Sequence, residues 1–343
     1  MEDRSNEIIS QYEMKIYRSY RARGGVILET DRGLRFLSPC RASERRLEFE
    51  DALKMQIREH GYKNIDNCVR NTQQKLVSVN SVGERYYLRE WYALAECSLR
   101  QEESVAMAAE NLALLHLAMS GIRIGEDGMI FEEEDPLPLL ERRNRELKRV
   151  QGFLAKRKNK SGFEVKYLNC CGSFYEEALR ATEELRGMNC SAFLEECIRY
   201  GNVAHGSYTY HNILMDGDVK RQPGVSPWVA GHIATVNFEQ AAFGMQINDL
   251  YQYLRKVMEK NNWNQELGKR LLNAYENVRA LSVKEKQMIK ILLMYPEKFW
   301  KVTNYYYNSR KSLIPQKNIE KLEMLLMQQK KKEEFLHFIQ CSC

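Results

Sequence analysis

The sequence is poor in features that would place the protein in a membrane or on nucleic acid. It has only 7 prolines in 343 residues and no run of about 18 apolar residues, the length that a membrane span requires. The acidic, polar start predicts that no secretory signal peptide is present. Its 52 Lys and Arg nearly balance 46 Asp and Glu, and the two signs are mixed along the chain. We therefore expect neither membrane insertion nor nucleic-acid binding.

Cysteine pairs with metal-binding spacing are also missing. The nine cysteines are an odd number, and no Cys-x-x-Cys pair has a matching partner pair. This argues against a zinc site and favours reduced, mostly buried thiols. An alternative remains for Cys341 and Cys343, which could cross-link to another chain under oxidising conditions.

What is present predicts an α+β protein of two lobes. Hydrophobic residues make up 44% of the chain and charged residues 29%, enough for a substantial core. Period-two patterns predict strands at 15–23, 26–30, 34–37, 75–80 and 85–90, with one helix at 43–60. After Trp91 the pattern predicts helices at 102–120, 135–158, 163–188, 192–200, 249–260, 267–280, 283–294, 296–310 and 316–334. We expect an antiparallel-sheet N-terminal lobe over residues 1–91 and a mainly helical lobe over 92–343.

A loop-like segment interrupts the helices and contains the most informative motif. Residues 205–212 read His-Gly-Ser-Tyr-Thr-Tyr-His-Asn and precede a short apolar run. This resembles the catalytic loop of aminoglycoside and choline phosphotransferases, which read His-Gly-Asp, four residues, then Asn. The resemblance implies a protein-kinase-like fold, in which the aspartate acts on the attacking hydroxyl and the asparagine binds a metal. Here His205 and Asn212 match, but Ser207 replaces the aspartate, and a serine hydroxyl cannot serve as that base.

The second half of such a site is expected at residues 233–239. By the same resemblance, Asn237 takes the position of the principal metal-binding aspartate. A neutral amide is a poorer ligand for Mg²⁺ than a carboxylate, so metal ligation would fall to Asn212, Asn237 and, as a substitute, Glu239. Asp249 is expected to cap the helix that follows.

The third expected element is a lysine on the third strand that contacts nucleotide phosphates. Aligning the strands puts Ser38 at this cofactor-binding position, with Arg35 and Arg41 nearby as possible substitutes. Its acidic partner on the next helix would be Glu48 or Glu50. The turn at 21–25 has too few glycines for a phosphate-cradling loop and predicts a plain hairpin.

The C-terminal region narrows the resemblance. Tyr295-Pro296-Glu297-Lys298-Phe299-Trp300, the Tyr305-Tyr306-Tyr307 run and Ile319-Glu320-Lys321-Leu322 are similar to the CotS family of bacterial spore coat proteins, which share the aminoglycoside-phosphotransferase fold. The likeness extends over residues 12–336. It implies synthesis in the cytoplasm, deposition in the coat of an endospore and other coat proteins as partners.

Together, Ser38, Ser207 and Asn237 alter the phosphate, base and metal positions at once. We therefore expect a catalytically impaired, kinase-like coat protein with a structural or interaction role, which holds ATP and Mg²⁺ weakly if at all. Two alternatives stay open. One is an active phosphotransferase that uses non-standard residues on a small-molecule acceptor. The other is a nucleotide-sensing protein without turnover. The sequence also leaves open whether side chains such as Tyr208 and Tyr210 fill the cleft.

Overall fold

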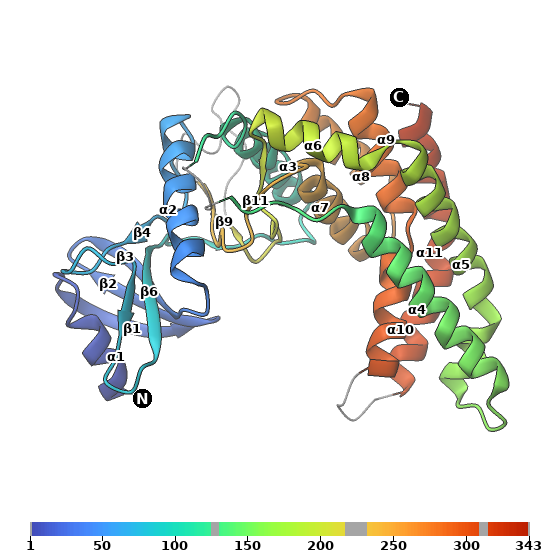
Figure 1. Ribbon diagram of the computed structural model, residues 1–343, viewed down its shortest axis with the longest axis horizontal. Coiled ribbons are helices and arrows are strands. Elements are labelled where there is room, and N and C mark those ends of the chain that lie inside the picture. Colours follow the sequence, from blue (N-terminus) through green and yellow to red (C-terminus); the bar gives the residue numbers. More distant parts are fainter. Residues whose placement is uncertain (1, 125–129, 217–231, 309–314, 342–343) are drawn as a thin grey trace.

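The N-terminal part is built on an antiparallel sheet. The computed structural model describes residues 2–124, 130–216, 232–308 and 315–341. The sheet, blue in Figure 1, has the order β1-β2-β3-β6-β4, and β5 also pairs with β6. Its strands are β1 (Ile16–Ala22), β2 (Gly25–Thr30), β3 (Gly33–Pro39), β4 (Cys68–Val69), β5 (Val77–Val79) and β6 (Arg85–Glu90). Helix α1 (Glu2–Ile9) packs on it through Ile8, and helix α2 (Glu44–Glu59) lies between the sheet and the other helices.

Local sequence explains these elements. The turn between β1 and β2 consists of Arg23 and Gly24, and Gly24 has a φ of +81°, which glycine adopts without strain. Helix α2 begins after Ser43, whose side chain accepts the N–H of Arg46. The predicted hairpin at 21–25 is therefore confirmed.

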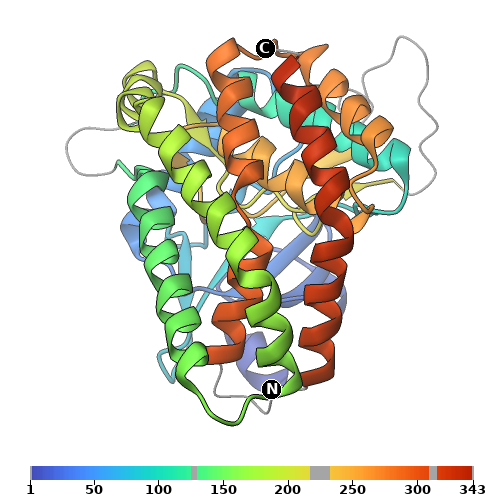
Figure 2. The same cartoon turned by 90° about the vertical axis from the view of Figure 1, so that its right-hand side faces the viewer.

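The rest of the molecule is mainly helical. Its helices are α3 (Glu102–Ala118), α4 (Pro136–Lys156), α5 (Gly162–Gly187), α6 (Cys190–Tyr200), α7 (Ile247–Lys260), α8 (Gln265–Glu276), α9 (Val283–Met294), α10 (Glu297–Asn308) and α11 (Pro315–Cys341). Helices α4, α5, α10 and α11 run side by side on the opposite side of the molecule from the sheet (Figure 1), and Figure 2 views them with the sheet behind. A single large apolar core joins these helices to α2.

Short strands lie between the sheet and the helices and carry the predicted loop. β9 (Ile213–Met215) is the middle strand of a second sheet with β10 (Ile233–Thr235) and β7 (Ala95–Glu96), while β8 (Val203–Ala204) pairs with β11 (Ala242–Phe243). An isolated bridge from Ile65 to Thr235 connects the segment after α2 with β10. The loop of residues 205–212 is thus anchored by a strand at each end.

The α+β fold predicted from the sequence is confirmed, and most expected elements are present within a few residues. Helix α1 and the two-residue strands β4 and β7 were not predicted, and α11 continues to Cys341 rather than ending at 334. The end of the predicted helix 296–310 and Cys343 lie outside the described residues. Six cysteines are buried with free thiols, while Cys341 is exposed. In the described part of the chain, every helix is too short or too polar for a membrane span.

Candidate functional site

The loop of residues 205–212 is held in place by its main chain. Asp249, in the first turn of α7, accepts the N–H of His205 at 2.6 Å and the N–H of Gly206 at 2.9 Å. His116, buried as a core residue, contacts the same carboxylate at 3.3 Å through Nε2. The prediction that Asp249 caps its own helix was wrong, because its carboxylate binds the loop and α7 has no side-chain cap. These contacts hold the start of the loop through its main chain.

His205 lies behind the loop, in the core. Its ring packs on Phe238 with centroids 4.5 Å apart, and its side chain is fully buried. The N–H of Ser207 donates to Nδ1 at 3.2 Å, so Nε2 carries the proton and donates to the Val236 carbonyl, also at 3.2 Å. Burial lowers the pKa of His205, which keeps the imidazole neutral. His205 therefore joins the loop to the segment after β10 and lines neither of the cavities described below.

Ser207 and Asn212 are brought together, but they bind each other. The side-chain amide of Asn212 donates to the Ser207 carbonyl at 2.8 Å and to the Ser207 hydroxyl oxygen at 3.0 Å. In the resembled enzymes these two positions hold the base and a metal ligand. Here both side chains are neutral, and the Asn212 amide donates a hydrogen bond to the Ser207 hydroxyl oxygen.

Asn237 follows β10, as the resemblance predicts. Its φ of +69° is left-handed, a conformation that Asn tolerates better than most residues do. Its N–H donates to Asp66 Oδ2 at 2.9 Å, while its own Oδ1 is buried without a hydrogen-bond partner among the described residues. The position is thus fixed through the main chain, and the side chain offers one amide oxygen.

The cation beside Ser38 comes from a neighbouring strand. Ser38 is buried on β3, and its hydroxyl lies 3.4 Å from Nη2 of Arg89 on β6. Strand register places Arg89 opposite Phe36 and Tyr87 opposite Ser38. Neither predicted substitute lies there: Arg35 contacts the Leu34 carbonyl, and Arg41 lines a different cavity.

Arg89 is part of a buried cluster of four charges that sum to zero. Its members are Glu50, Lys54, Asp66 and Arg89. Lys54 Nζ contacts Glu50 Oε1 at 2.5 Å and Asp66 Oδ1 at 2.9 Å, and Arg89 Nη1 contacts Asp66 Oδ2 at 2.9 Å. Burial alone would lower the pKa of Lys54, but Asp66 and Glu50 outweigh it and raise that pKa. Glu50 thus pairs within α2, and the alternative partner Glu48 is exposed.

A cleft of about 540 Å³ collects most of the predicted site residues. Its lining includes the polar residues Ser38, Arg89, Ser207, Asn212, Asn237 and Glu239 and the apolar residues Ile27, Phe36, Trp91, Leu94, Leu214 and Val236. Tyr208 does not fill it, because that ring is buried in the helical lobe and donates to the Ala108 carbonyl at 2.7 Å. Tyr210 does not line it either. The cleft is open.

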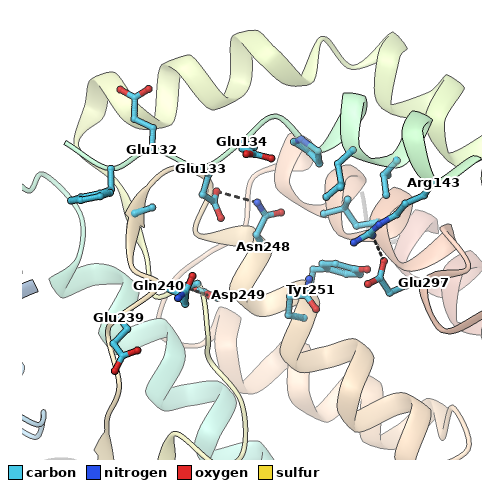
Figure 3. Close-up of a pocket in the computed structure, with 18 of the residues that line it drawn as sticks. Glu132, Glu133, Glu134, Arg143, Glu239, Gln240, Asn248, Asp249, Tyr251 and Glu297 are labelled. Atoms are coloured by element: carbon cyan, nitrogen blue, oxygen red, sulfur yellow. Dashed lines mark hydrogen bonds and ion pairs between the residues drawn. The ribbon is translucent and has the colours of Figure 1, made fainter. Parts of the chain in front are cut away.

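A second, larger cavity of about 850 Å³ adjoins the cleft and is acidic (Figure 3). Its charged lining is Glu132, Glu133, Glu134, Glu239, Asp249 and Glu297, with Arg41, Arg46 and Arg143. Glu133 accepts from Met245 N at 2.7 Å and from the Asn248 amide at 3.1 Å, and Arg143 pairs with Glu297 at 2.5 Å (Figure 3). Burial, and then nearby Asp249, raise the pKa of Glu133 to about 8. Glu239 lines both cavities and accepts the Tyr87 hydroxyl.

The donors in the cleft do not fit a divalent metal ion. Mg²⁺ prefers carboxylate oxygens, yet the two positions expected to bind it are the amides of Asn212 and Asn237. Glu239 is already bound to Tyr87. Within the described ranges, His, Cys, Asp and Glu nowhere form a group of three or more that could hold a metal. No chemical step through a metal is therefore assigned here.

The fold is that of the aminoglycoside phosphotransferases. An aminoglycoside phosphotransferase from Alicyclobacillus acidocaldarius is 17% identical, with a TM-score of 0.84 over 98% of this chain and 95% of that one. A microcompartment-associated aminopropanol kinase is 13% identical, with a TM-score of 0.63 over 97% and 98%. A spectinomycin phosphotransferase in complex with ADP and spectinomycin is 10% identical, with a TM-score of 0.61 over 95% of this chain and 96% of that one. At these identities the likeness establishes the two-lobed, kinase-like fold alone.

Within that fold, the C-terminal third points to a narrower group. Residues 234–339 match the family model described as "Spore coat putative kinase YutH". The match includes Asn237, Glu239 and the motif from Tyr295 to Leu322, and it begins after the loop of residues 205–212. The predicted resemblance to CotS-like spore coat proteins on a phosphotransferase fold is thereby confirmed.

Sequence reasoning missed Arg89, Asp66 and the acidic cavity. The search for a cation was confined to the third strand, whereas strand pairing brings β6 beside it. The available signal was the spacing of Tyr87 and Arg89, which are two residues apart and therefore lie on one face of β6. Glu132-Glu133-Glu134 was visible as an acidic run, but nothing in the sequence placed it next to Asp249.

Proposed function

We propose that this chain is a spore coat protein with a kinase-like fold that binds other coat proteins and does not transfer phosphoryl groups. One observation carries the proposal: the Asn212 amide donates to the Ser207 hydroxyl oxygen at 3.0 Å. The residues at the base and metal positions thus satisfy each other, and neither is charged. The match of residues 234–339 to a spore coat family supports the location.

The missing chemistry is energetically large. Phosphoryl transfer depends on a group that orients the nucleophile and on cations that neutralise charge developing on the phosphoryl oxygens. Losing one preorganised electrostatic contact of this kind costs about 3 kcal/mol in the transition state, roughly a hundredfold in rate. Three altered positions in one cleft are therefore expected to lower turnover by several orders of magnitude.

The first test is a phosphotransfer assay. Purified protein with ATP and Mg²⁺ is offered hydroxyl-bearing acceptors, and ADP release is measured beside isothermal titration of ATP. We expect no release above the buffer rate. Turnover that vanishes in Asn212→Ala would overturn the proposal, since it would show that the cleft is catalytic.

The second test concerns the coat. Fluorescent fusions of the wild-type chain and of Ser207→Ala are followed during sporulation of an endospore-forming bacterium that lacks its own copy. Both are expected at the coat in equal amounts. Failure of the wild-type fusion to localise there, with the protein intact in the cell, would argue against a coat role.

A second candidate function, a phosphotransferase that uses Glu239, is favoured by one feature. Glu239 lines both the cleft and the acidic cavity, so its carboxylate lies where an acceptor in one cavity would meet a phosphate in the other. If this second function is correct, the protein consumes ATP, and Glu239→Gln abolishes that consumption. Glu134→Gln, at the exposed rim of the acidic cavity, should leave it intact.

A further inference from the structure

We infer that the cleft binds a nucleoside polyphosphate without a divalent metal ion, and that Arg89 of β6 is the cation facing the phosphates. The inference rests on the proposed function, because it concerns a cleft that binds ligand without turnover. The expected cation on β3 has not simply been lost. A guanidinium from the neighbouring strand lines the same cleft.

The position of Arg89 follows from strand register. Residues opposite one another in paired strands share a face of the sheet, and Phe36, Ser38, Tyr87 and Arg89 all belong to the face that lines the cleft or borders it. The guanidinium carbon lies 5.3 Å from the Phe36 ring centroid and 4.6 Å from that of Tyr87. These two rings hold the group in one orientation, with Nη2 directed at Ser38.

The guanidinium retains hydrogen-bonding capacity. Nη1 contacts Asp66, Nη2 has only the long 3.4 Å contact to Ser38, and Nε is buried without a hydrogen-bond partner among the described residues. A planar fork of N–H donors matches two phosphate oxygens at once, which a lysine ammonium cannot do. Ser38 adds a neutral hydroxyl beside it. Arg89 can thus keep its contact with Asp66 and still bind an oxyanion.

The surrounding charges do not attract a metal ion. Lys54 and Arg89 both contact Asp66, which in turn accepts the N–H of Asn237 at the expected metal position. With Glu50 these four buried charges cancel, so they add no net attraction for a divalent ion to the weak ligation that amides offer. The two carboxylates that line the cleft already have donors: Glu96 contacts His211 at 2.5 Å, and Glu239 accepts from Tyr87. Their repulsion of a polyphosphate is thereby reduced.

The apolar part of the lining suits a flat base. Trp91 stacks on Phe36 with centroids 4.5 Å apart and an interplanar angle of 27°, and Leu94, Leu214 and Val236 complete an apolar wall. A volume of about 540 Å³ lies in the range of sites for ligands of this size. The cleft therefore combines an apolar pocket with a cationic end.

The wild-type protein gives the first test. ATP is titrated calorimetrically in excess EDTA and again with Mg²⁺, and ADP release is followed in the same samples. We expect dissociation constants that agree within about twofold. Absence of binding, or binding at least tenfold tighter with Mg²⁺, overturns the inference. Turnover with Mg²⁺ instead overturns the proposed function, so the two failures are told apart.

The assignment to Arg89 is tested by Arg89→Lys, which keeps a cation against Asp66 but loses the fork. ATP binding in EDTA is expected to weaken about tenfold, because a charge-assisted bidentate contact is lost. The matched control is Arg70→Lys, an arginine of the same lobe that pairs with Asp51 and lines neither cavity. Circular dichroism and thermal melting verify that both variants fold. If Arg89→Lys does not fold, the binding measurement is repeated with Arg89→Gln. A folded Arg89 variant that binds as tightly as wild type overturns the assignment.

Discussion

The cleft and the acidic cavity adjoin each other and share Glu239, yet they use charge in opposite ways. In the cleft the cation Arg89 is neutralised by Asp66 within a buried cluster, and the loop positions are neutral. In the acidic cavity six carboxylates face three arginines. The difference teaches that the buried charges at the expected reaction centre cancel one another, while acidic side chains outnumber basic ones in the neighbouring space.

The first prediction tests whether the charge of the cleft is structural. Asp66→Ala leaves Lys54 and Arg89 buried with Glu50 as their only acid, which should lower the free energy of unfolding by about 4 kcal/mol. Urea denaturation measures this. The control is Asp51→Ala, which breaks a partly exposed pair with Arg70 and should cost less than about 1 kcal/mol. Equal losses in the two variants would contradict the structural role.

The next test concerns the contact that holds the loop between the two regions. Asp249→Asn leaves one of the N–H groups of His205 and Gly206 without a carboxylate oxygen, so we expect a loss of about 2 kcal/mol in unfolding free energy. Glu134→Gln, at the exposed rim of the acidic cavity, should change it by less than about 0.5 kcal/mol. If Asp249→Asn proves as mild as its control, the loop is held by other contacts.

A pH series tests the acidic cavity. The pKa of Glu133 is raised to about 8 in the folded protein, against an ordinary value near 4.5, so between these pH values the folded state holds one proton more than the unfolded chain. Stability from this group is therefore present at low pH and lost as pH rises, by at most about 1.4 kcal/mol per pH unit, and the effect levels off above pH 8. Glu133→Gln keeps an acceptor oxygen for Met245 and Asn248.

The comparison is between melting curves of wild type and Glu133→Gln from pH 4 to pH 9. The two should agree near pH 4, and the variant should become progressively the more stable up to pH 8. Parallel curves over the whole range would show that Glu133 ionises normally in the folded protein.

The smallest effect is expected where enzymes of this fold are most sensitive. Ser207→Ala removes only a hydroxyl that accepts from Asn212, so the free energy of unfolding should fall by no more than about 1 kcal/mol. Nucleotide binding should persist. A loss of several kcal/mol would mean that the Ser207 hydroxyl, rather than the main chain, organises the loop, and it would weaken the contrast between the two regions.

Much of the fold could be predicted from the sequence because it depends on local patterns. Gly24 in a two-residue turn, Ser43 before α2 and the mostly apolar sequence of α3 each determine structure within a few residues. Helix α1 was missed because it has only eight residues and its buried apolar side chain, Ile8, packs against the distant sheet. Strands β4 and β7 have two residues each, too few for any period to be read.

The residues of the candidate site could be predicted where they are close together in the sequence, but contacts between distant residues could not. The spacing of His205, Ser207 and Asn212 identified the loop, and the structure places Ser38, Asn237 and Glu239 in the same cleft. What the sequence could not supply were partners distant in the chain. Asp66 reaches Asn237 over a separation of 171 residues, and Arg46 of α2 donates to the carbonyls of Glu239 and Ala241. Such contacts follow from how the lobes meet, which no local pattern encodes.

The left-handed backbone at Asn237 bears on how proteins of this fold diverge. Aspartate and asparagine are nearly the same size and are among the few residues that accept a positive φ. Exchanging one for the other at this point requires no change in the path of the chain, so the charge at the expected metal position can change by a single substitution in an unchanged scaffold. The shape of this segment therefore does not depend on which of the two residues it carries.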